Sequence, residues 1–442
     1  VAGLAGGNTV ILKPATVAAP VAWLFAKAFW DAGVPKEALQ VIITDREALK
    51  VLTTAPAVKH IILTGGTDTA QNIARSNPAP PLSAETGGKN AIILTASGDR
   101  DHAIMNIVAS AFGNAGQKCS ACSLLLVERS VYEDKNFQDK LKDAATSMKV
   151  GSVWNPGNVV GPMITNKNDK LLKALELEKG ESWLVPPRFL DKHKYVLAPT
   201  VKWGVRPGNY SFRTELFGPM LSVVCIENLQ QGIDLVNSLE YGLTSGLQSL
   251  DEGEQKLWKD SIMAGNLYIN RGITGAIVNR QPFGGMKLSA FGGGVKAGGP
   301  NYCACFVNIA DKPGSTTDYT QSYVKAYEQE FAHARDVNNL YGEQNAFRYL
   351  PLKNMVLRLF PGDNNEDAKM IALAARICHT PLSISFEPGD DRTAALASLG
   401  CPLKEEALAG FLKSMKNYER IRTCGADIPM EMYEEAARID KY

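Results

Sequence analysis

The segment at residues 112–123, FGNAGQKCSACS, holds the residues whose types and spacing offer the clearest chemistry in this chain. Cys119 and Cys122 lie three positions apart among small and polar residues. The pattern predicts a helix before Cys119 and an apolar strand, ACSLLLVE, after it. A cysteine in such a turn can act as a nucleophile when its thiolate is favoured. The other interpretations are a redox pair, a metal ligand and a buried structural cysteine.

The sequence context argues against two of these interpretations. A CxxC redox pair usually starts a helix, whereas a strand is predicted to follow Cys119. A zinc site needs about four ligands, but the sequence has no second CxxC, and its five histidines are scattered. We therefore predict no metal site. The nucleophile and the buried structural cysteine both remain open on this motif alone.

Two further motifs lie at predicted strand ends. In GGNTVILKPAT, Lys13 follows a strand at the edge where sheets meet ligands, and it could bind a ribose or a phosphate. In LTGGTDTA, the turn at Thr64, Gly65 and Gly66 joins a strand to a helix. The N–H groups of such a turn can bind a pyrophosphate. A surface lysine and a plain turn are the alternatives.

The motif AETGGKN offers an acid–base group. Glu85 stands at the end of a predicted strand, and Gly87 and Gly88 follow it. Glycine allows another group to approach the backbone closely. A carboxylate in this position can serve as a general base. The alternative is a surface glutamate at a strand end.

Composition restricts the class of protein. Of 442 residues, 45% are hydrophobic and 21% are charged, as in ordinary soluble globular proteins. The 47 basic and 46 acidic residues leave a net charge of +1, which argues against a nucleic-acid partner. We see no apolar run of membrane-spanning length and no signal-peptide pattern. Eight cysteines without a secretion signal favour a reducing compartment, so we predict a cytoplasmic location.

Apolar strands alternate with amphipathic helices from the start of the chain. Strands are predicted at NTVILKP, VIITD and HIILTGG, and again at NAIILTA, ACSLLLVE and LSVVCIE. This alternation predicts parallel sheets covered by helices, in two α/β domains. After about Asp311, DKPGSTTDYTQS predicts a linker. A charged helix near residues 319–337 and a smaller α/β unit, with strands NMVLRLF and PLSISF, are expected to follow.

The order and spacing of the motifs are more specific than any one of them. Glu85 precedes Cys119 by 34 residues, and TELFGP and QPFGGMKLSAFG follow downstream. Together they resemble the aldehyde dehydrogenase superfamily over roughly residues 1–310. The segment at 264–302, which contains NRQPFGGMKLSAFGGGVKAGGPNY, resembles one branch. That branch is L-glutamate γ-semialdehyde (Δ1-pyrroline-5-carboxylate) dehydrogenase, in the version found in the bifunctional proline-utilisation enzyme PutA.

The resemblance implies an α/β chain with the aldehyde dehydrogenase fold. It implies a Rossmann-like NAD-binding domain at residues 1–84, with its N-terminal part missing, and an α/β catalytic domain at 85–270. An aldehyde-anchor loop and oligomerisation segment would occupy 271–312. A linker and an extra small α/β module, of packing, oligomer-contact or channel-covering role, would occupy 313–442.

The resemblance also implies the roles of site residues. Cys119 would attack the aldehyde to give a thiohemiacetal, and Glu85 would activate water against the thioester left after hydride transfer to the nicotinamide. Implied cofactor contacts come from Lys13, Thr16, Thr64, Gly65, Gly66, Gly87, Glu215 and Phe217. The substrate carboxylate would be held by Ser120, Gly275 and Ala276. Phe283 would pack on the substrate's aliphatic chain, with a core phenylalanine as the alternative.

Several positions depart from the family pattern. The oxyanion-stabilising asparagine of the family would lie upstream of Val1, so we expect this chain alone to be inactive. Thr16 stands where many NAD-using relatives carry glutamate, so NAD is the expected cofactor and NADP is not excluded. Gly66 replaces a serine that relatives place on the pyrophosphate. The resemblance further implies a homo-oligomer and an upstream proline dehydrogenase domain, where FAD would bind.

Overall fold

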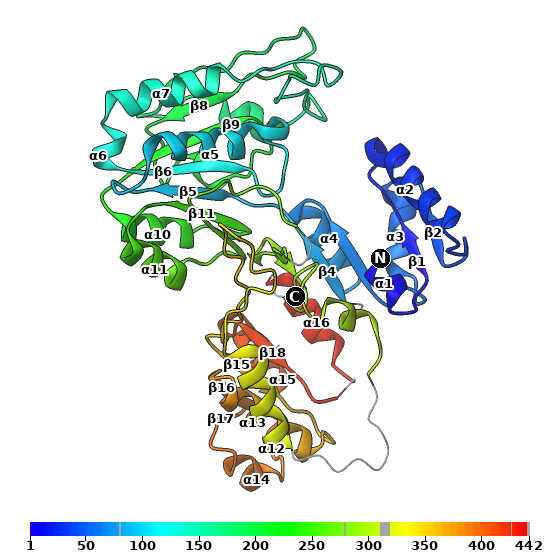
Figure 1. Ribbon diagram of the computed structural model, residues 1–442. Helices are drawn as coiled ribbons and strands as arrows, with labels where there is room; N and C mark the ends of the chain where they lie inside the picture. The colour runs from blue at the N-terminus through cyan, green and yellow to red at the C-terminus, as the bar shows by residue number, and fades with distance from the viewer. Residues whose placement is uncertain (79–80, 278–279, 310–318, 426, 440–442) are drawn as a thin grey trace.

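The computed structural model describes residues 1–78, 81–277, 280–309, 319–425 and 427–439. An N-terminal part, a large central unit and a C-terminal unit follow one another along the chain (Figure 1). The central unit contains the longest strands, and the C-terminal unit lies below it in this view. The predicted linker falls largely on residues outside the described ranges.

A seven-stranded sheet forms the centre of the large unit, in the order β12-β11-β5-β6-β9-β8-β7. All neighbouring strands are parallel except β7 and β8. The strands are β5 (Asn90–Leu94), β6 (Cys122–Glu128), β7 (Ser182–Val185), β8 (Thr200–Trp203), β9 (Met220–Ile226), β11 (Thr244–Gln248) and β12 (Asn266–Ile269). This topology confirms the α/β fold predicted from the sequence.

Helices cover both faces of this sheet (Figure 1). On one face Ile92 and Leu94 of β5 pack in a core with residues of α5 (Arg100–Phe112) and α7 (Lys135–Thr146). On the other face, Ala91 and Ile93 pack with α10 (Leu229–Asn237) and α11 (Glu252–Ser261). Strands covered on both faces have no polar side, which explains why these segments read as continuous apolar runs.

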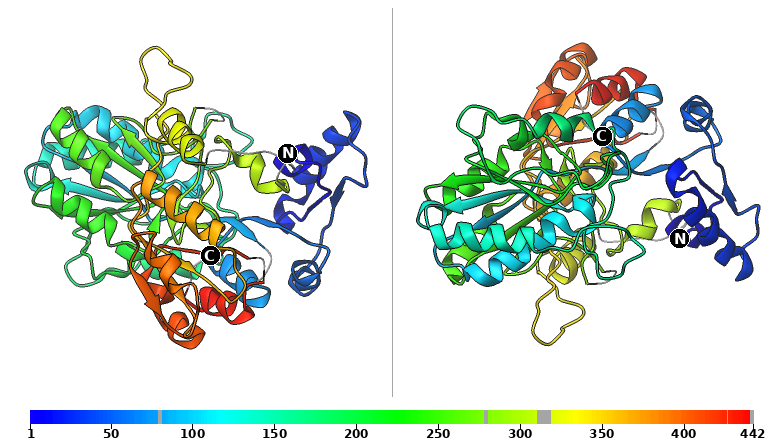
Figure 2. Two further views of the ribbon diagram at one scale, coloured as in Figure 1. Left: turned by 90° about the horizontal axis from the view of Figure 1, so that it is seen from below. Right: turned by 90° about the horizontal axis from the view of Figure 1, so that it is seen from above.

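The N-terminal strands divide between two small sheets. One consists of β1 (Val10–Leu12) and β2 (Leu39–Val41), and the other of β3 (Ile61–Thr64), β4 (Leu82–Glu85) and β14 (Ala290–Phe291). The strands occur close to their predicted positions, but the first pair is not in the same sheet as β3. Figure 2 shows this first pair and its helices at the side of the molecule. Its helices are α1 (Ala2–Ala5), α2 (Ala19–Asp31) and α3 (Arg46–Thr54).

The C-terminal unit has a four-stranded parallel sheet in the order β17-β16-β15-β18. Its strands are β15 (Met355–Arg358), β16 (Leu382–Phe386), β17 (Leu403–Glu405) and β18 (Arg420–Arg422). Helices α13 (Asn365–Ile377), α14 (Thr393–Ala397), α15 (Leu408–Ser414) and α16 (Met430–Arg438) accompany them. The predicted small α/β unit is therefore present.

One predicted helix of this unit was too long. Helix α12 (Tyr319–Ala326) continues only through a π-helical turn at Tyr327–Phe331. Beyond it, Arg335 pairs with Phe347 in an isolated antiparallel bridge. The prediction of a helix to residue 337 was wrong because charged residues are common both on exposed helices and in such extended surface segments.

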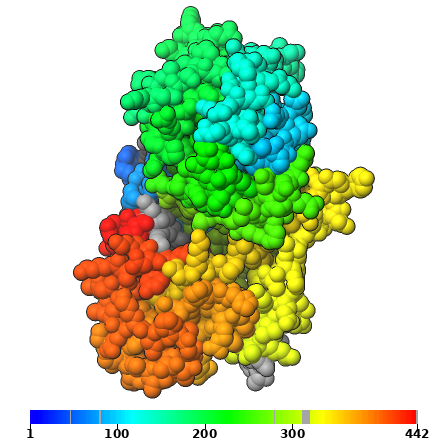
Figure 3. Space-filling model, turned by 90° about the vertical axis from the view of Figure 1, so that its left-hand side faces the viewer, coloured from blue at the N-terminus to red at the C-terminus, as the bar shows by residue number. Residues whose placement is uncertain are grey.

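The C-terminal unit is joined to the central unit by ion pairs, and a cavity lies between them. Arg271 and Arg280 contact Glu343, at 3.2 and 3.5 Å, and Arg348 contacts Asp260 at 3.4 Å. The cavity between the units measures about 3220 Å³. Figure 3 shows the two units stacked on each other. Within the described ranges, every helix is too short or too polar to cross a membrane.

Candidate active site

Cys119 lies in a turn between a distorted helix end and strand β6. The preceding 3₁₀ turn, Gly113–Gly116, contains three consecutive residues with positive φ, namely Asn114 at 56°, Ala115 at 54° and Gly116 at 64°. A Cβ on Gly116 would lie 2.3 Å from the carbonyl oxygen of Gly218. Glycine is required there because no side chain fits. This left-handed turn thus brings the Cys119 loop against the TELFGP segment.

Asn90 fixes the loop that carries the cysteine. Its Nδ2 donates to the carbonyl oxygens of Cys119 at 2.7 Å and Ala121 at 3.0 Å. Its Oδ1 accepts a hydrogen bond from the Thr244 N–H at 3.0 Å. A single buried amide therefore ties the nucleophile loop to two strands of the central sheet. Such a fully bonded buried polar group favours one arrangement of the loop.

The two cysteines of the CxxC pair occupy different environments. Cys119 is partly accessible, whereas Cys122 begins β6 and is 1% exposed. Burial raises the pKa of the Cys122 thiol to about 12. Burial also raises the pKa of Cys119, as does the nearby Glu85 carboxylate, while the N–H groups of Ser120 and Cys119 lower it. Both thiols are free in this structure.

Glu85 is the last residue of β4 and faces the nucleophile from the neighbouring sheet. Its carboxylate is near enough to Cys119 to raise the pKa of that thiol. Burial raises the pKa of Glu85 itself, and the positive charge of Lys296 opposes this effect. A partly desolvated carboxylate beside a thiol has the properties of a general base for reactions at that sulfur.

Glu215 is held against the backbone of the GG motif that follows Glu85. The Gly88 N–H donates to Glu215 Oε1 at 2.9 Å. A Cβ on Gly87 would lie 2.1 Å from Glu215 Oε2. Gly87 therefore has no room for a side chain while the carboxylate is in place. Burial raises the pKa of Glu215, and the Gly88 N–H lowers it.

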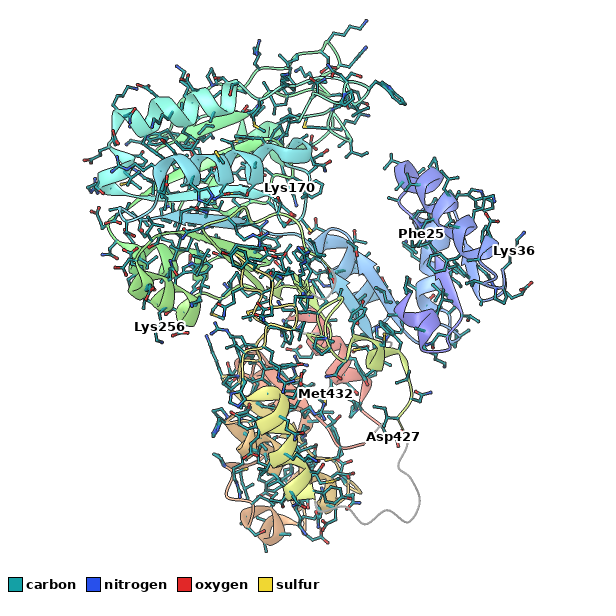
Figure 4. All side chains as sticks on the ribbon, viewed as in Figure 1. Phe25, Lys36, Lys170, Lys256, Asp427 and Met432 are labelled. Carbon is teal, nitrogen blue, oxygen red and sulfur yellow. The ribbon has the colours of Figure 1, made fainter. Side chains whose placement is uncertain are left out.

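The helix that follows the LTGG turn begins beside Glu215. Gly66 is the N-cap of α4 (Thr67–Ser76), and no side chain caps this helix end. Lys170, which Figure 4 labels, lies at the start of α8 (Asp169–Ala174) and contacts Asp68 of α4 at 3.7 Å. Both charges act on the Glu215 carboxylate. The open N-terminus of α4 and Glu215 together form a cradle that suits the phosphates and a ribose of a dinucleotide.

Some of the other predicted cofactor residues lie at this cradle, and others lie in a different sheet. Thr64 ends β3, and Gly65 and Gly66 lead into α4, so all three lie at its edge. Phe217 has positive φ and is 40% exposed, two residues beyond Glu215. Lys13 and Thr16 instead follow β1, which belongs to the separate two-stranded sheet. The structure thus does not bring them to the edge formed by β3 and β4.

The predicted substrate loop approaches the cysteine through a tyrosine. The Tyr268 hydroxyl donates to the carbonyl oxygen of Gly275 at 3.4 Å. Burial raises the pKa of Tyr268 to about 12, and Cys119 also acts on it. Gly275 has φ of 89° and is exposed, as is Ala276. The loop is therefore hydrogen-bonded to a tyrosine that lies within electrostatic range of Cys119.

Two further predicted substrate residues flank the same region. Ser120 follows the nucleophile directly and is 4% exposed. Phe283 is half-buried and pairs with Ala297 through two backbone hydrogen bonds of 3.0 Å. A half-buried phenylalanine retains apolar surface for a ligand, so both interpretations of Phe283 remain compatible with its burial.

Sequence reasoning missed three residues that organise the site, namely Asn90, Tyr268 and Lys296. Asn90 and Lys296 stand inside the motifs AETGGKN and KAGGPNY, so a search for buried polar residues next to these motifs would have found them. Tyr268 lies in an ordinary strand sequence, NLYI. Only the tertiary contact with Gly275 shows its place in the site.

Comparisons with known proteins show which family this chain resembles. The profile of the aldehyde dehydrogenase family matches residues 1–311. A 1-pyrroline-5-carboxylate dehydrogenase of Geobacillus sp. (strain WCH70) is 35% identical over 313 residues, covering 68% of this chain and 60% of that protein. The corresponding Bacillus subtilis (strain 168) protein is 34% identical with the same coverage. The chain thus spans about 60% of the length of these curated relatives.

Solved structures show the same similarity. Proline Utilization A (PutA) from Corynebacterium freiburgense is 36% identical, with a TM-score of 0.83, and the match covers 100% of this chain and 45% of that one. A Thermus 1-pyrroline-5-carboxylate dehydrogenase with bound NAD is 32% identical, with a TM-score of 0.64. That match covers 68% of this chain and 60% of the other.

Proposed function

The chain belongs to the aldehyde dehydrogenase family, and we propose that the protein oxidises L-glutamate γ-semialdehyde to L-glutamate with NAD. The observation that carries this proposal is the arrangement around one thiol. Glu85 raises the pKa of Cys119, and Cys119 raises the pKa of Tyr268. The Tyr268 hydroxyl also donates a hydrogen bond to the loop of Gly275. These interactions support a site in which a nucleophile, a base and a backbone anchor act on one substrate. The names of the relatives and the NAD bound to the Thermus structure support the same substrate and cofactor.

The proposed reaction proceeds through a covalent intermediate on the cysteine. The Cys119 sulfur attacks the aldehyde carbon to give a thiohemiacetal, which splits one difficult step into two easier ones. NAD, when bound, would accept a hydride. Loss of the hydride from carbon and of the hydroxyl proton to solvent turns the thiohemiacetal into a thioester on Cys119. Glu85 then removes a proton from water as the water oxygen attacks the thioester carbonyl. The C–S bond breaks, glutamate leaves and the thiol is restored.

The residues of the cradle fit a dinucleotide at its nicotinamide end. Glu215, bonded to the Gly88 N–H, has its second carboxylate oxygen available for ribose hydroxyls. The uncapped N-terminus of α4 provides N–H donors for phosphate oxygens. We propose that Phe217 packs beside the nicotinamide. Lys13 and Thr16 are proposed to bind the adenosine side, and Thr16 leaves use of NADP open.

The wider setting of the reaction is also proposed. The similarity to Proline Utilization A over this whole chain supports a parent protein that also carries a proline dehydrogenase, where FAD would bind. A homo-oligomer and a cytoplasmic location remain part of this proposal. Residues 1–84, 85–270, 271–312 and 313–442 are the proposed functional divisions.

Substrate choice provides a direct test of the carboxylate anchor. We expect Ser120→Ala to raise KM for L-glutamate γ-semialdehyde roughly ten- to a hundredfold, because a hydrogen bond to a charged group contributes about 1.5–3 kcal/mol. KM for propanal, which has no carboxylate, should hardly change. The measurement is the ratio of the two KM changes in the full-length protein. Equal shifts would show that the carboxylate binds elsewhere.

Cofactor binding is tested at Gly87. Gly87→Ala should raise KM for NAD by roughly tenfold or more, because the new Cβ displaces the Glu215 carboxylate from its hydrogen bond. Gly208→Ala is the matched control, since a Cβ on Gly208 meets nothing within 4 Å. Steady-state kinetics with varied NAD measure both variants. An unchanged KM in Gly87→Ala would contradict the role of Glu215.

A further inference from the structure

Lys296 is a half-buried cation that the mechanism above does not use. It lies in the loop after β14, within the KAGGPNY motif. Its Nζ donates to the carbonyl oxygen of Gly265, to that of Gly284 at 3.1 Å, and to Asn266 Oδ1 at 3.4 Å. Three oxygen acceptors satisfy all three donors of an ammonium group. This set of acceptors therefore suits the ammonium group of a lysine.

The hydrogen bonds of Lys296 join two segments of the active site. Gly265 and Asn266 lie at the start of β12, and Gly284 belongs to the PFGG loop that carries Phe283. A Cβ on Gly265 would lie 1.8 Å from the Gly284 carbonyl oxygen, so the two backbones meet closely. Asn266 Nδ2 also donates to the Pro282 carbonyl oxygen at 3.0 Å. Lys296 completes this junction.

The same ammonium faces the general base. Glu85 is the charged group that acts on Lys296, and Lys296 lowers the pKa of Glu85 against the effect of burial. Burial lowers the pKa of Lys296 to about 8. The other titratable groups that Glu85 faces are Cys119, from the nucleophile loop, and Tyr302, from the 3₁₀ turn Tyr302–Phe306. Neither is a cation, so Lys296 provides the positive charge among these neighbours.

We propose that Lys296 is a positioning residue for thioester hydrolysis, whose ammonium fixes the PFGG loop on β12 and places its positive charge within electrostatic range of the Glu85 carboxylate. This inference rests on the proposed role of Glu85 as the base that takes a proton from the attacking water. Below the pKa of Lys296, the positive charge extends the range in which Glu85 is ionised toward lower pH. Above about 8, Lys296 loses its charge, and the junction loses its ammonium.

Two substitutions separate the charge of Lys296 from its hydrogen bonds. Lys296→Gln keeps a donor and removes the charge, whereas Lys296→Arg keeps the charge and changes the shape of the donor. Lys287→Met is the matched control. Lys287 also donates to two backbone carbonyl oxygens, those of Asn237 at 2.7 Å and Leu239 at 2.8 Å, but Lys353, and not Glu85, acts on it.

The assay follows hydrolysis of 4-nitrophenyl acetate by the full-length protein across pH. This activated ester acylates a thiol without a cofactor, so steady release of nitrophenol after the first turnover reports hydrolysis of the acyl-cysteine. In Lys296→Gln the acidic limb of the pH–rate profile should shift to higher pH by roughly one unit. The reason is that the Glu85 carboxylate has a higher pKa without its cation. Lys296→Arg and Lys287→Met should keep the wild-type limb.

The outcomes distinguish this inference from the proposed function. A lower rate with an unshifted limb in Lys296→Gln would overturn the inference and leave a merely structural lysine. A shift in both Lys296 variants would also overturn it, since Arg keeps the charge. If Lys296→Gln does not fold, Lys296→Arg decides alone: its acidic limb should stay at the wild-type position, and a shifted limb would overturn the inference. Ester hydrolysis without oxidation of the semialdehyde would instead reject the proposed function.

Discussion

Cys119→Ala should reduce NADH formation by the full-length protein to the background rate, whereas Cys122→Ala should keep most of it. The reason is positional. Cys119 lies in a turn fixed by Asn90 and faces Glu85, while Cys122 begins β6 and packs in the core. Removal of the nucleophile removes both the thiohemiacetal and the thioester, so no part of the covalent route survives.

The experiment on the two cysteines also has a chemical arm. Iodoacetamide should modify Cys119 and inactivate the protein, and the rate should rise with pH because burial and Glu85 raise the pKa of this thiol. Cys122 should stay unmodified, since it is buried with a pKa near 12. A comparable loss of activity in both alanine variants would instead support a redox pair. The measurements are NADH absorbance and mass spectrometry of the labelled peptide.

The central sheet was predictable because the amino-acid sequences of its strands show that both of their faces are buried. Segments such as NAIILTA and LSVVCIE are apolar throughout, and a parallel sheet covered on both faces requires this. The structure places β5 and β9 in these segments. The turn of Cys119 was equally visible, because glycine and small residues separate a helix from a strand at residues 113–121.

The sheet pairing of the N-terminal strands was not predictable from their composition. The segments of β1 and β3 are both short and apolar, and the pattern of each says only that it is a strand. Which strands become neighbours depends on partners elsewhere in the chain. β4, for example, pairs on one side with β14, which lies about 200 residues later. The separation of Lys13, after β1, from Thr64, at the end of β3, could therefore not be predicted from the two motifs.

The residues that hold the active site in place could not be predicted from the sequence for a related reason. Asn90 acts through a buried hydrogen bond to the distant Thr244, and Lys296 through a partly buried one to Gly265. In the sequence, a lysine or an asparagine normally indicates surface. Only the folded chain shows that each has several hydrogen-bond partners from distant segments. The sequence motifs thus identified the reacting groups, and tertiary contacts identified the groups that hold them.

Glu85→Gln should separate the two halves of the reaction in the full-length protein. The amide has nearly the shape of the carboxylate but cannot accept a proton from water, so acylation of Cys119 should proceed and hydrolysis should stall. We expect a burst of NADH close to one per active site, followed by steady turnover lower by roughly 10²- to 10⁴-fold, which is the usual contribution of general acid–base catalysis. Stopped-flow absorbance resolves the burst from the steady rate.

A matched acid and a chemical rescue make this test specific to Glu85. Glu128 also ends a strand and is half-buried, but it accepts a hydrogen bond from the Ala96 N–H at 2.7 Å, away from the nucleophile. Glu128→Gln should therefore keep wild-type turnover. Hydroxylamine attacks a thioester without help from a general base, so it should restore turnover to Glu85→Gln and yield a hydroxamate. Loss of the burst would move the role of Glu85 to the acylation step, and wild-type turnover would remove it from the mechanism.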